Sequence, residues 1–431
     1  MNTLSIILFR SVLPHECYIR IMLESAHRRE GERSAMRRLA SFLCVIALNT
    51  FFTMLLGACQ SDSPSAQQLT STATPAPPRT LLVWHALPQD ERAALEELRR
   101  NFEAAHPTID VQLVAHPADT LLETFRQQTL AGAGPDLLIF PRSELPGLAG
   151  SGLIQALDNS LIDAITTYQT PIALSIATLD GTTYGVTLAT EFPTLYYRRS
   201  LLTPSFASVE EFVAQAKIAG LVVPPTFAAT AGLLLAADPE PFDEDGPLPS
   251  ALLSYFAALA NMATTPSVHF TTDPAPFMSG NATLLIASSN DYPQLADAVG
   301  NDLGVTTWPG HGPSSWRVPV QGEPVIGISL NITRQSAEAA NLFLAYLLAP
   351  DSQALWFVRT GKAPANAHAM PDRELATAWG NALQWGLPLP IVPKNAVDAL
   401  AALDAAVREV VLQGLSPSAA VERVQNALSA P

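Results

Sequence analysis

The amino-acid sequence predicts an α/β fold, because short apolar runs of strand length alternate with segments of helical periodicity throughout the region after residue 79. The first part of this region gives the order strand, helix, strand, helix, strand, so we expect a parallel sheet with right-handed crossover connections. About 350 residues follow residue 79, a length that suits about two domains.

The elements at the start of this region have clear boundaries. Residues 80–85 form an apolar run that predicts a buried strand, and a helix is predicted at 90–106 from the helical spacing of its apolar residues. Pro107 ends this helix. The next predictions are a strand at 109–114, a helix at 121–131 that ends at Gly132, and a strand at 137–140.

The rest of the region continues the same pattern. Ser208 is followed three residues later by Glu211, which is typical of a capping box and predicts a helix at 208–219. Further strands are predicted at 195–197, 284–287, 304–308 and 324–330, and further helices at 336–349, 396–413 and 418–428.

The N-terminal part contains a secretory signal that ends in a lipobox. Arg37 and Arg38 precede an apolar run at 39–56, which closes with Leu56-Gly57-Ala58-Cys59. We therefore predict a signal peptide at 36–58 and a lipid anchor on Cys59 that holds the protein to the membrane outside the cytoplasm. A retained transmembrane helix is the alternative, although the run is close to the minimum of ~18 residues for a span.

Two flanking segments belong to this interpretation. Residues 1–35 precede a complete signal that has its own Met36, so we interpret them as an extension from a wrongly assigned start. Residues 59–79 carry the lipidated cysteine followed by a stretch rich in Ser, Thr, Pro, Ala and Gln, which predicts a flexible linker.

Charge and cysteine content exclude several classes of function. The chain carries 24 Lys and Arg against 39 Asp and Glu, a formal charge of −15, which disfavours binding to nucleic acid or to an anionic membrane surface. The three cysteines are Cys17, Cys44 and Cys59, so the mature part keeps no free thiol for a disulfide, a metal cluster or a nucleophile. No hydrolase elbow, phosphate loop, dinucleotide fingerprint or zinc-protease motif occurs, and we expect neither catalysis nor a cofactor.

Several short segments carry a further signal through their order along the chain. They are Leu82-Val83-Trp84-His85, 102–111, 131–136, 152–158, Asp180-Gly181-Thr182-Thr183-Tyr184-Gly185-Val186, 191–197, 277–282, and 339–347 with Thr360-Gly361-Lys362-Ala363-Pro364. In this order they resemble the family 1 extracellular solute-binding proteins of ATP-binding-cassette importers, the group that includes maltose-binding protein. The resemblance covers nearly all of the chain from Thr80 to Ala430.

The resemblance implies a two-lobed periplasmic-binding-protein fold with hinge crossovers. The first α/β lobe is then expected at 80–190 with 327–362, and the second at 191–326 with 363–431. In such a fold a ligand that touches both lobes favours their closure. The chain departs from the family at Arg198-Arg199, where Asn-Lys is usual, and the segment between Ala219 and Phe277 is short for the family.

Three candidate ligand-binding residues lie at strand ends. Glu191 matches the family glutamate at the first crossing between lobes, with a surface carboxylate or an ion pair between lobes as the alternative. Trp84 and His85 close the first strand, where open α/β sheets place ligands, although Trp84 also suits core packing.

Further candidates follow from the need of a sugar site for flat stacking surfaces and hydrogen-bonding groups. Asn290 and Tyr292 follow the strand after the Gly280 turn, where maltose-binding relatives carry a stacking aromatic residue. Trp316 and Trp385 lie in loops rich in Gly and Pro, with simple packing as the alternative. Asp136 begins a strand and either caps it or binds ligand.

The sequence thus predicts a monomeric, lipid-anchored receptor that captures a sugar or oligosaccharide and delivers it to the permease of an ATP-binding-cassette importer. The alternatives are the same architecture binding a polyamine, a glycerophosphate or a metal ion, and a receptor that signals to a membrane sensor. Tyr196-Tyr197 resembles the paired tyrosines of ferric-ion-binding proteins, but strand alternation would turn the two rings to opposite faces.

Overall fold

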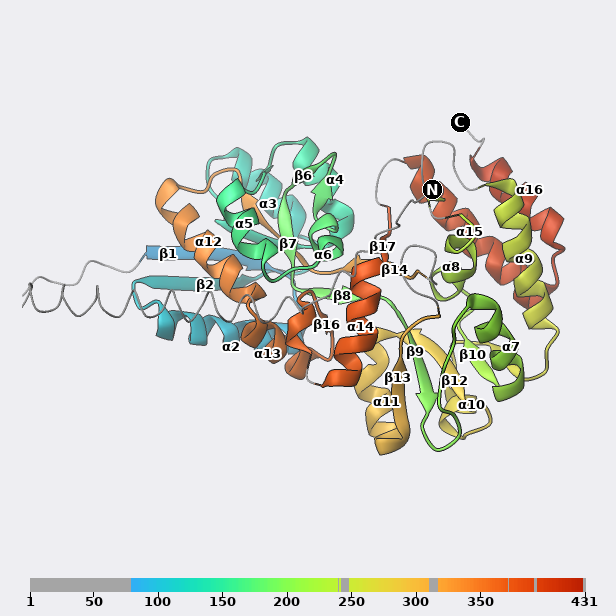
Figure 1. Cartoon of the computed structure of the whole chain (residues 1–431). Helices are drawn as coiled ribbons and strands as arrows, with labels where there is room; N and C mark the ends of the chain where they lie inside the picture. The colour runs from blue at the N-terminus through green and yellow to red at the C-terminus, as the bar shows by residue number, and fades with distance from the viewer. Residues whose placement is uncertain are drawn as a thin grey trace, which may run out of the picture. The chain divides into compact units, whose positions relative to one another are not determined.

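The computed structural model describes residues 79–238, 240–241, 248–309, 317–370, 372–390 and 394–428, all within one compact unit (Figure 1). The signal peptide, Cys59 and the linker predicted from the sequence lie outside these residues. The predicted α/β fold is confirmed, because helices pack on three mixed sheets and a two-stranded ribbon. No helix in this described part combines the length and apolarity that a membrane span requires.

The first sheet has the strand order β2-β1-β3-β15-β4, with β7 also pairing with β15. Its strands are β1 (Arg79–His85), β2 (Ile109–Ala115), β3 (Leu137–Phe140), β4 (Ile154–Gln155), β7 (Gly185–Thr187) and β15 (Val325–Ser329). As predicted, β1 runs parallel to β2 and β3. Strand β15, from much later in the chain, is antiparallel to β3, β4 and β7.

Helices from both ends of the chain cover this sheet. The early ones are α2 (Gln89–Ala105), α3 (Leu121–Leu130), η1 (Arg142–Glu144), α4 (Leu145–Gly150), α5 (Asn159–Thr166) and α6 (Pro171–Ser175), with the ribbon β5 (Thr178–Leu179) and β6 (Thr182–Thr183). The late ones, α12 (Arg334–Leu348) and α13 (Pro350–Thr360), pack on β1 and α2 (Figure 1). The apolar stripe predicted for 90–106 is buried, and Phe102 contacts Phe343 of α12.

The second sheet has the order β11-β10-β12-β9-β13. Its strands are β9 (Pro193–Arg198), β10 (Leu221–Val223), β11 (Val268–Phe270), β12 (Leu284–Ser288) and β13 (Leu303–Thr306). Its helices are α7 (Val209–Ala219), α8 (Phe227–Leu235), α9 (Pro249–Ala263), α10 (Ala275–Met278), η2 (Ser289–Asp291), α11 (Tyr292–Val299), η3 (Gly300–Asp302) and α14 (Arg373–Trp385). Ser208 caps α7 by accepting a hydrogen bond from the Glu211 N–H, as predicted.

A small third sheet lies where the chain passes between the other two. Its order is β16-β8-β14-β17, formed by β8 (Ala189–Glu191), β14 (Pro319–Gly322), β16 (Ala363–Pro364) and β17 (Leu387–Pro388). The chain runs from β7 through β8 to β9, returns from β13 through β14 to β15, and passes from α13 through β16 and η5 (Ala367–Ala369) to α14. These passages fall on the stretches where the family resemblance implies hinge crossovers.

Two features near the C-terminal half refine the predictions. Helices α15 (Lys394–Gln413) and α16 (Pro417–Leu428) pack with α8 and α9 around a separate apolar cluster. Strand β13 stops at Thr306, short of the predicted end at 308. Trp308 instead tucks into the core, 3% exposed, and its Nε1 donates to the Pro193 carbonyl at 3.2 Å.

Candidate ligand-binding site

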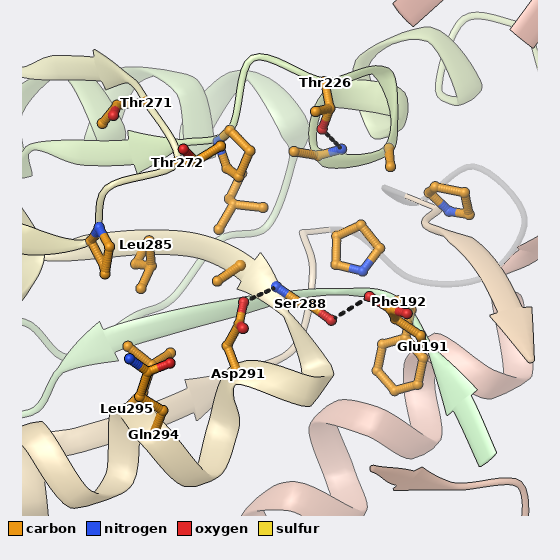
Figure 2. Close-up of a pocket in the computed structure, with 18 of the residues that line it drawn as sticks. Glu191, Phe192, Thr226, Thr271, Thr272, Leu285, Ser288, Asp291, Gln294 and Leu295 are labelled. Carbon is orange, nitrogen blue, oxygen red and sulfur yellow. Dashed lines mark hydrogen bonds between the residues drawn. The ribbon is translucent and has the colours of Figure 1, made fainter. Parts of the chain in front are cut away.

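A cavity of about 380 Å³ lies against the second sheet, beside the crossing strands β8 and β14 (Figure 2). It is lined by Glu191, Phe192, Pro193, Pro224, Thr226, Ala228, Ala229, Thr271, Thr272, Pro274, Met278, Leu285, Ile286, Ala287, Ser288, Asp291, Gln294, Leu295, Pro319, Gln321 and Leu389. The cavity therefore lies in the lobe whose middle segment the sequence marked as short.

Glu191 and Asp291 are joined through Ser288 on the polar wall of this cavity. The Ser288 hydroxyl donates to Glu191 Oε1 at 2.8 Å, and the Ser288 N–H donates to Asp291 Oδ2 at 3.0 Å (Figure 2). The second bond belongs to a capping box in which Ser288 starts η2 directly after β12. Pairing of Glu191 with Gln321 across β8 and β14 fixes the position of the glutamate.

Ionisable groups give this wall a negative character. Glu191 is partly buried, and no residue in the described lining is basic. Desolvation of its carboxyl group raises the pKa of Asp291 against the opposing hydrogen bond from the Ser288 N–H, although the residue as a whole is exposed at the rim. Two acceptor groups thus face the cavity with their remaining lone pairs available.

The opposite wall is apolar and aliphatic. It is formed mainly by proline and leucine side chains, among them Pro193, Pro224, Leu285 and Leu389. Phe192 lies in the lining but is only 1% exposed, because its ring packs edge-on against Trp379. Within the described lining the stacking surface for a sugar ring would therefore be aliphatic.

Arg142 supports the cavity wall from behind. This side chain is 7% exposed, and its Nε donates to the Ile176 carbonyl at 2.8 Å while Nη1 donates to the Leu389 carbonyl at 2.7 Å. Burial lowers the pKa of Arg142 to about 10, against the opposing effect of the Glu323 charge. The guanidinium stays charged at neutral pH and holds Leu389, a lining residue, in place.

Two smaller cavities of about 210 Å³ adjoin the first. One shares Glu191 and Gln321 with it and is also lined by Asn290, Glu323 and Lys362. The other shares Glu323 and Lys362 with that one and lies at the carboxyl ends of β1 and β3, next to Ala86 and Pro141. The three cavities form a series along the crossing strands.

The structure brings two of the predicted site residues together. Glu191 lines the main cavity and the adjoining one, and Asn290 lines the adjoining one. The Asn290 N–H donates to Ser288 Oγ at 3.1 Å, and its side-chain Oδ1 is buried without a hydrogen-bond partner among the described residues. The binding role of both residues stays a prediction.

Trp84 and His85 are placed elsewhere by packing. His85 is 1% exposed, its Nδ1 accepts from the Leu87 N–H at 3.2 Å, and burial together with the charge of Arg92 lowers its pKa. The Trp84 ring lies 4.3 Å from the His116 ring, centroid to centroid. Neither residue lines the three cavities, whereas the residues directly after β1 do.

The remaining predicted residues also lie away from the main cavity. Tyr292 packs against Trp379, with ring centroids 5.7 Å apart, which uses the ring for the core. Asp136 lies at the amino end of β3 and accepts from the Leu82 N–H at 2.8 Å, so it secures the strand. Trp385 ends α14 outside the lining, and Trp316 lies outside the described residues.

Sequence reasoning missed Ser288, Asp291, Gln321 and Arg142. The spacing of Ser288 and Asp291 at the end of an apolar run is a capping signal that could have located this turn. Gln321 and Arg142 have no local signal, because strand pairing and tertiary hydrogen bonds alone give them their positions. In the part of the chain that the structure describes, no group of three His, Cys, Asp or Glu side chains could hold a metal ion.

Comparison with known proteins places the chain among binding proteins. A protein of Brucella abortus named as a binding protein is 31% identical over 106 residues, which are 25% of this chain and 26% of that protein. The galactooligosaccharide-binding protein of Bacillus subtilis is 24% identical over 166 residues, or 38% of this chain and 37% of the relative. The chain thus matches only about a quarter to a third of the length of these relatives.

The fold extends the similarity over much more of the chain. The structure of an extracellular solute-binding protein from Staphylococcus aureus in complex with maltose aligns with a TM-score of 0.69 at 17% identity, over 82% of this chain and 98% of that one. This confirms the two-lobed fold. Residues 97–382 match the family of bacterial extracellular solute-binding proteins, and the chain therefore belongs to that family.

Proposed function

We propose that the protein is a lipid-anchored receptor outside the cytoplasm that captures a saccharide in the cavity beside Glu191 and delivers it to the permease of an ATP-binding-cassette importer. The observation that carries this proposal is the cavity itself. Strands β8 and β12 bring Glu191 and Ser288 onto one polar wall that faces aliphatic side chains, in a chain of a solute-binding family.

The chemistry of the two walls suits a sugar. A sugar ring has an apolar face and a rim of hydroxyl groups, and carboxylates accept two such hydroxyl bonds each. The volume of about 380 Å³ falls in the range of about 300–1,000 Å³ that is typical of small-molecule sites. The relative named for galactooligosaccharide and the aligned structure that holds maltose support the same ligand class.

The anchor and the importer rest on the sequence and the family. The lipobox at Cys59 supports attachment to the membrane, and family membership supports a position outside the cytoplasm. Among the alternatives, an anionic glycerophosphate suits the cavity poorly because its described lining carries acids and no base. A polyamine, and a receptor that signals to a membrane sensor, are separated from the proposal by experiment.

A thermal-shift screen tests the ligand class. The panel holds neutral and amino saccharides, spermidine, glycerol phosphate and divalent cations, and a ligand at about 100 times its dissociation constant should add roughly 2.7 kcal/mol of stability. We expect a saturable rise with at least one saccharide. A rise with spermidine or a metal ion and with none of the saccharides would overturn the proposal.

A matched pair of variants then locates the site. Gln321 is exposed and lines two of the cavities, so Gln321→Ala should weaken saccharide binding about two- to tenfold through one lost hydrogen bond. Gln128→Ala, an equally exposed change on α3 outside the lining, should leave the affinity unchanged. Equal affinities of both variants would place the ligand elsewhere.

A further inference from the structure

The three adjoining cavities carry a charge imbalance that a neutral sugar would leave uncompensated. Their described lining holds four acidic residues, Glu191, Asp291, Glu323 and Glu91, and a single base, Lys362. The Lys362 ammonium is already engaged, because it pairs with the Glu91 carboxylate, whose side chain is 5% exposed. No ion pair of Glu191 or Asp291 is found among the described residues, so these charges face the cavity without a cationic partner.

Asn290 adds an independent observation beside Glu191. Its Oδ1 is buried and accepts no hydrogen bond from any described residue. A buried acceptor without a donor costs free energy that a ligand donor recovers. Asn290 and Glu191 line the same small cavity, so a group with several N–H donors and a positive charge would satisfy both.

We propose that the solute is a saccharide that carries a protonated amine, with the ring in the main cavity and the ammonium group between Glu191, Asp291 and Asn290. This inference rests on the proposed function, since it names the kind of saccharide. The aliphatic wall of Pro193, Pro224 and Leu285 matches a ring face. A linear polyamine has no such face and would leave that wall in contact with water.

The decisive experiment compares saccharides that differ in one group. Glucose, galactose and mannose, and the β-1,4-linked disaccharide of glucose, are each titrated beside their 2-amino and 2-acetamido analogues by calorimetry. The amino and acetamido analogues keep the ring and differ in charge. We expect at least one amino saccharide to bind about tenfold or more tightly than both of its neutral analogues.

Variants test whether the acidic wall causes this preference. Glu191→Gln and Asp291→Asn should each reduce the ratio of amino to neutral affinity by about threefold or more, and added salt should reduce it further in the wild-type protein. Asp297→Asn removes the same charge from an exposed position on α11 outside the lining and should keep the ratio. A ratio unchanged in both cavity variants would assign the preference to another cause and overturn the proposed contact.

The outcomes separate this inference from the proposed function. Neutral saccharides that bind as tightly as their amino analogues would overturn the amine and leave the saccharide receptor standing. Binding of spermidine with no saccharide bound at millimolar concentration would overturn both. Failure of every amino saccharide to bind, with a neutral one bound, would overturn the inference alone.

Discussion

At the scale of single residues, Glu191 connects the crossing strand β8 to the cavity. Its carboxylate accepts one hydrogen bond from the Ser288 hydroxyl and forms no ion pair among the described residues. Glu191→Gln keeps the shape and can still accept that bond, but it loses the charge. We expect ligand affinity to fall roughly ten- to a hundredfold, since charge-assisted hydrogen bonds contribute about 1.5–3 kcal/mol each.

Calorimetric titration and melting of the ligand-free protein together check this prediction. The melting temperature of the free protein should change little, because no cationic partner is left behind. Asp297→Asn is the control for loss of a surface charge. A variant that melts early while binding normally would show instead that Glu191 has a structural role.

His85 gives the protein a pH-dependent term in its stability. Burial lowers the pKa of His85 in the folded protein below the ordinary value of 6.5, so the unfolded chain binds the proton more readily. The contribution is fully present above about pH 6.5 and is lost as pH falls through the lowered folded value. Protonation of Nδ1 also breaks the hydrogen bond from the Leu87 N–H.

A variant that cannot titrate tests this term. His85→Asn keeps an acceptor oxygen, so its unfolding free energy should fall less between about pH 7.5 and about pH 5 than that of the wild type, whatever its stability at neutral pH. Urea unfolding at several pH values measures both slopes, with His368→Asn, an exposed histidine, as control. Parallel slopes for wild type and His85→Asn would contradict the prediction.

At the scale of elements, the crossing strand β14 depends on a glycine for its fit. A Cβ added at Gly322 would lie 2.7 Å from Ile176 Cδ1 and 2.8 Å from Thr187 Oγ1, and the Thr187 hydroxyl already donates to the Ala189 carbonyl at 2.9 Å. Gly322→Ala should therefore cost about 1–3 kcal/mol of stability through overpacking. Gly147→Ala on α4, with no atom near the added Cβ, should be neutral or slightly stabilising.

Denaturant unfolding of the two alanine variants measures this difference. The comparison controls for the general effect of alanine on the entropy of the unfolded chain, which both variants share. Equal midpoints for Gly322→Ala and Gly147→Ala would show that the crossing strands relax around an extra methyl group.

At the scale of the whole molecule, the three chain passages between the sheets predict a hinge. Glu191, Gln321 and Lys362 lie at these passages and also line the cavities, so ligand contacts and hinge geometry are linked. A ligand with higher affinity for the closed state shifts the population toward it. The radius of gyration from solution scattering should fall at saturating ligand, and an unchanged curve with bound ligand would exclude closure.

Attachment to the membrane is the second prediction at this scale. Cys59→Ser removes the thiol that takes the diacylglyceryl group, so labelling by fatty acid should be lost and the precursor should stay uncleaved. Cys44→Ser, inside the apolar run, is the matched control and should still be labelled. Labelling of the Cys59→Ser protein would refute the lipoprotein interpretation.

The sequence by itself determined the features that depend on neighbouring residues. The stripe of Ala94, Leu95, Leu98 and Phe102 predicted α2, and Ser208 with Glu211 predicted the start of α7, because helical periodicity and caps act within a few residues. The order of short segments identified the family, and Glu191 and Asn290 were chosen because strand ends are local signals as well.

Only the tertiary structure decided which side chains share the cavity. Ser288 reaches Glu191 across 97 residues of sequence, and Gln321 reaches it through the pairing of β8 with β14. Tyr292 and Trp84 could serve packing or a ligand equally well by residue type, and their ring contacts assigned them to packing. Long-range strand pairing and core packing set these positions, and neither leaves a periodic pattern in the chain.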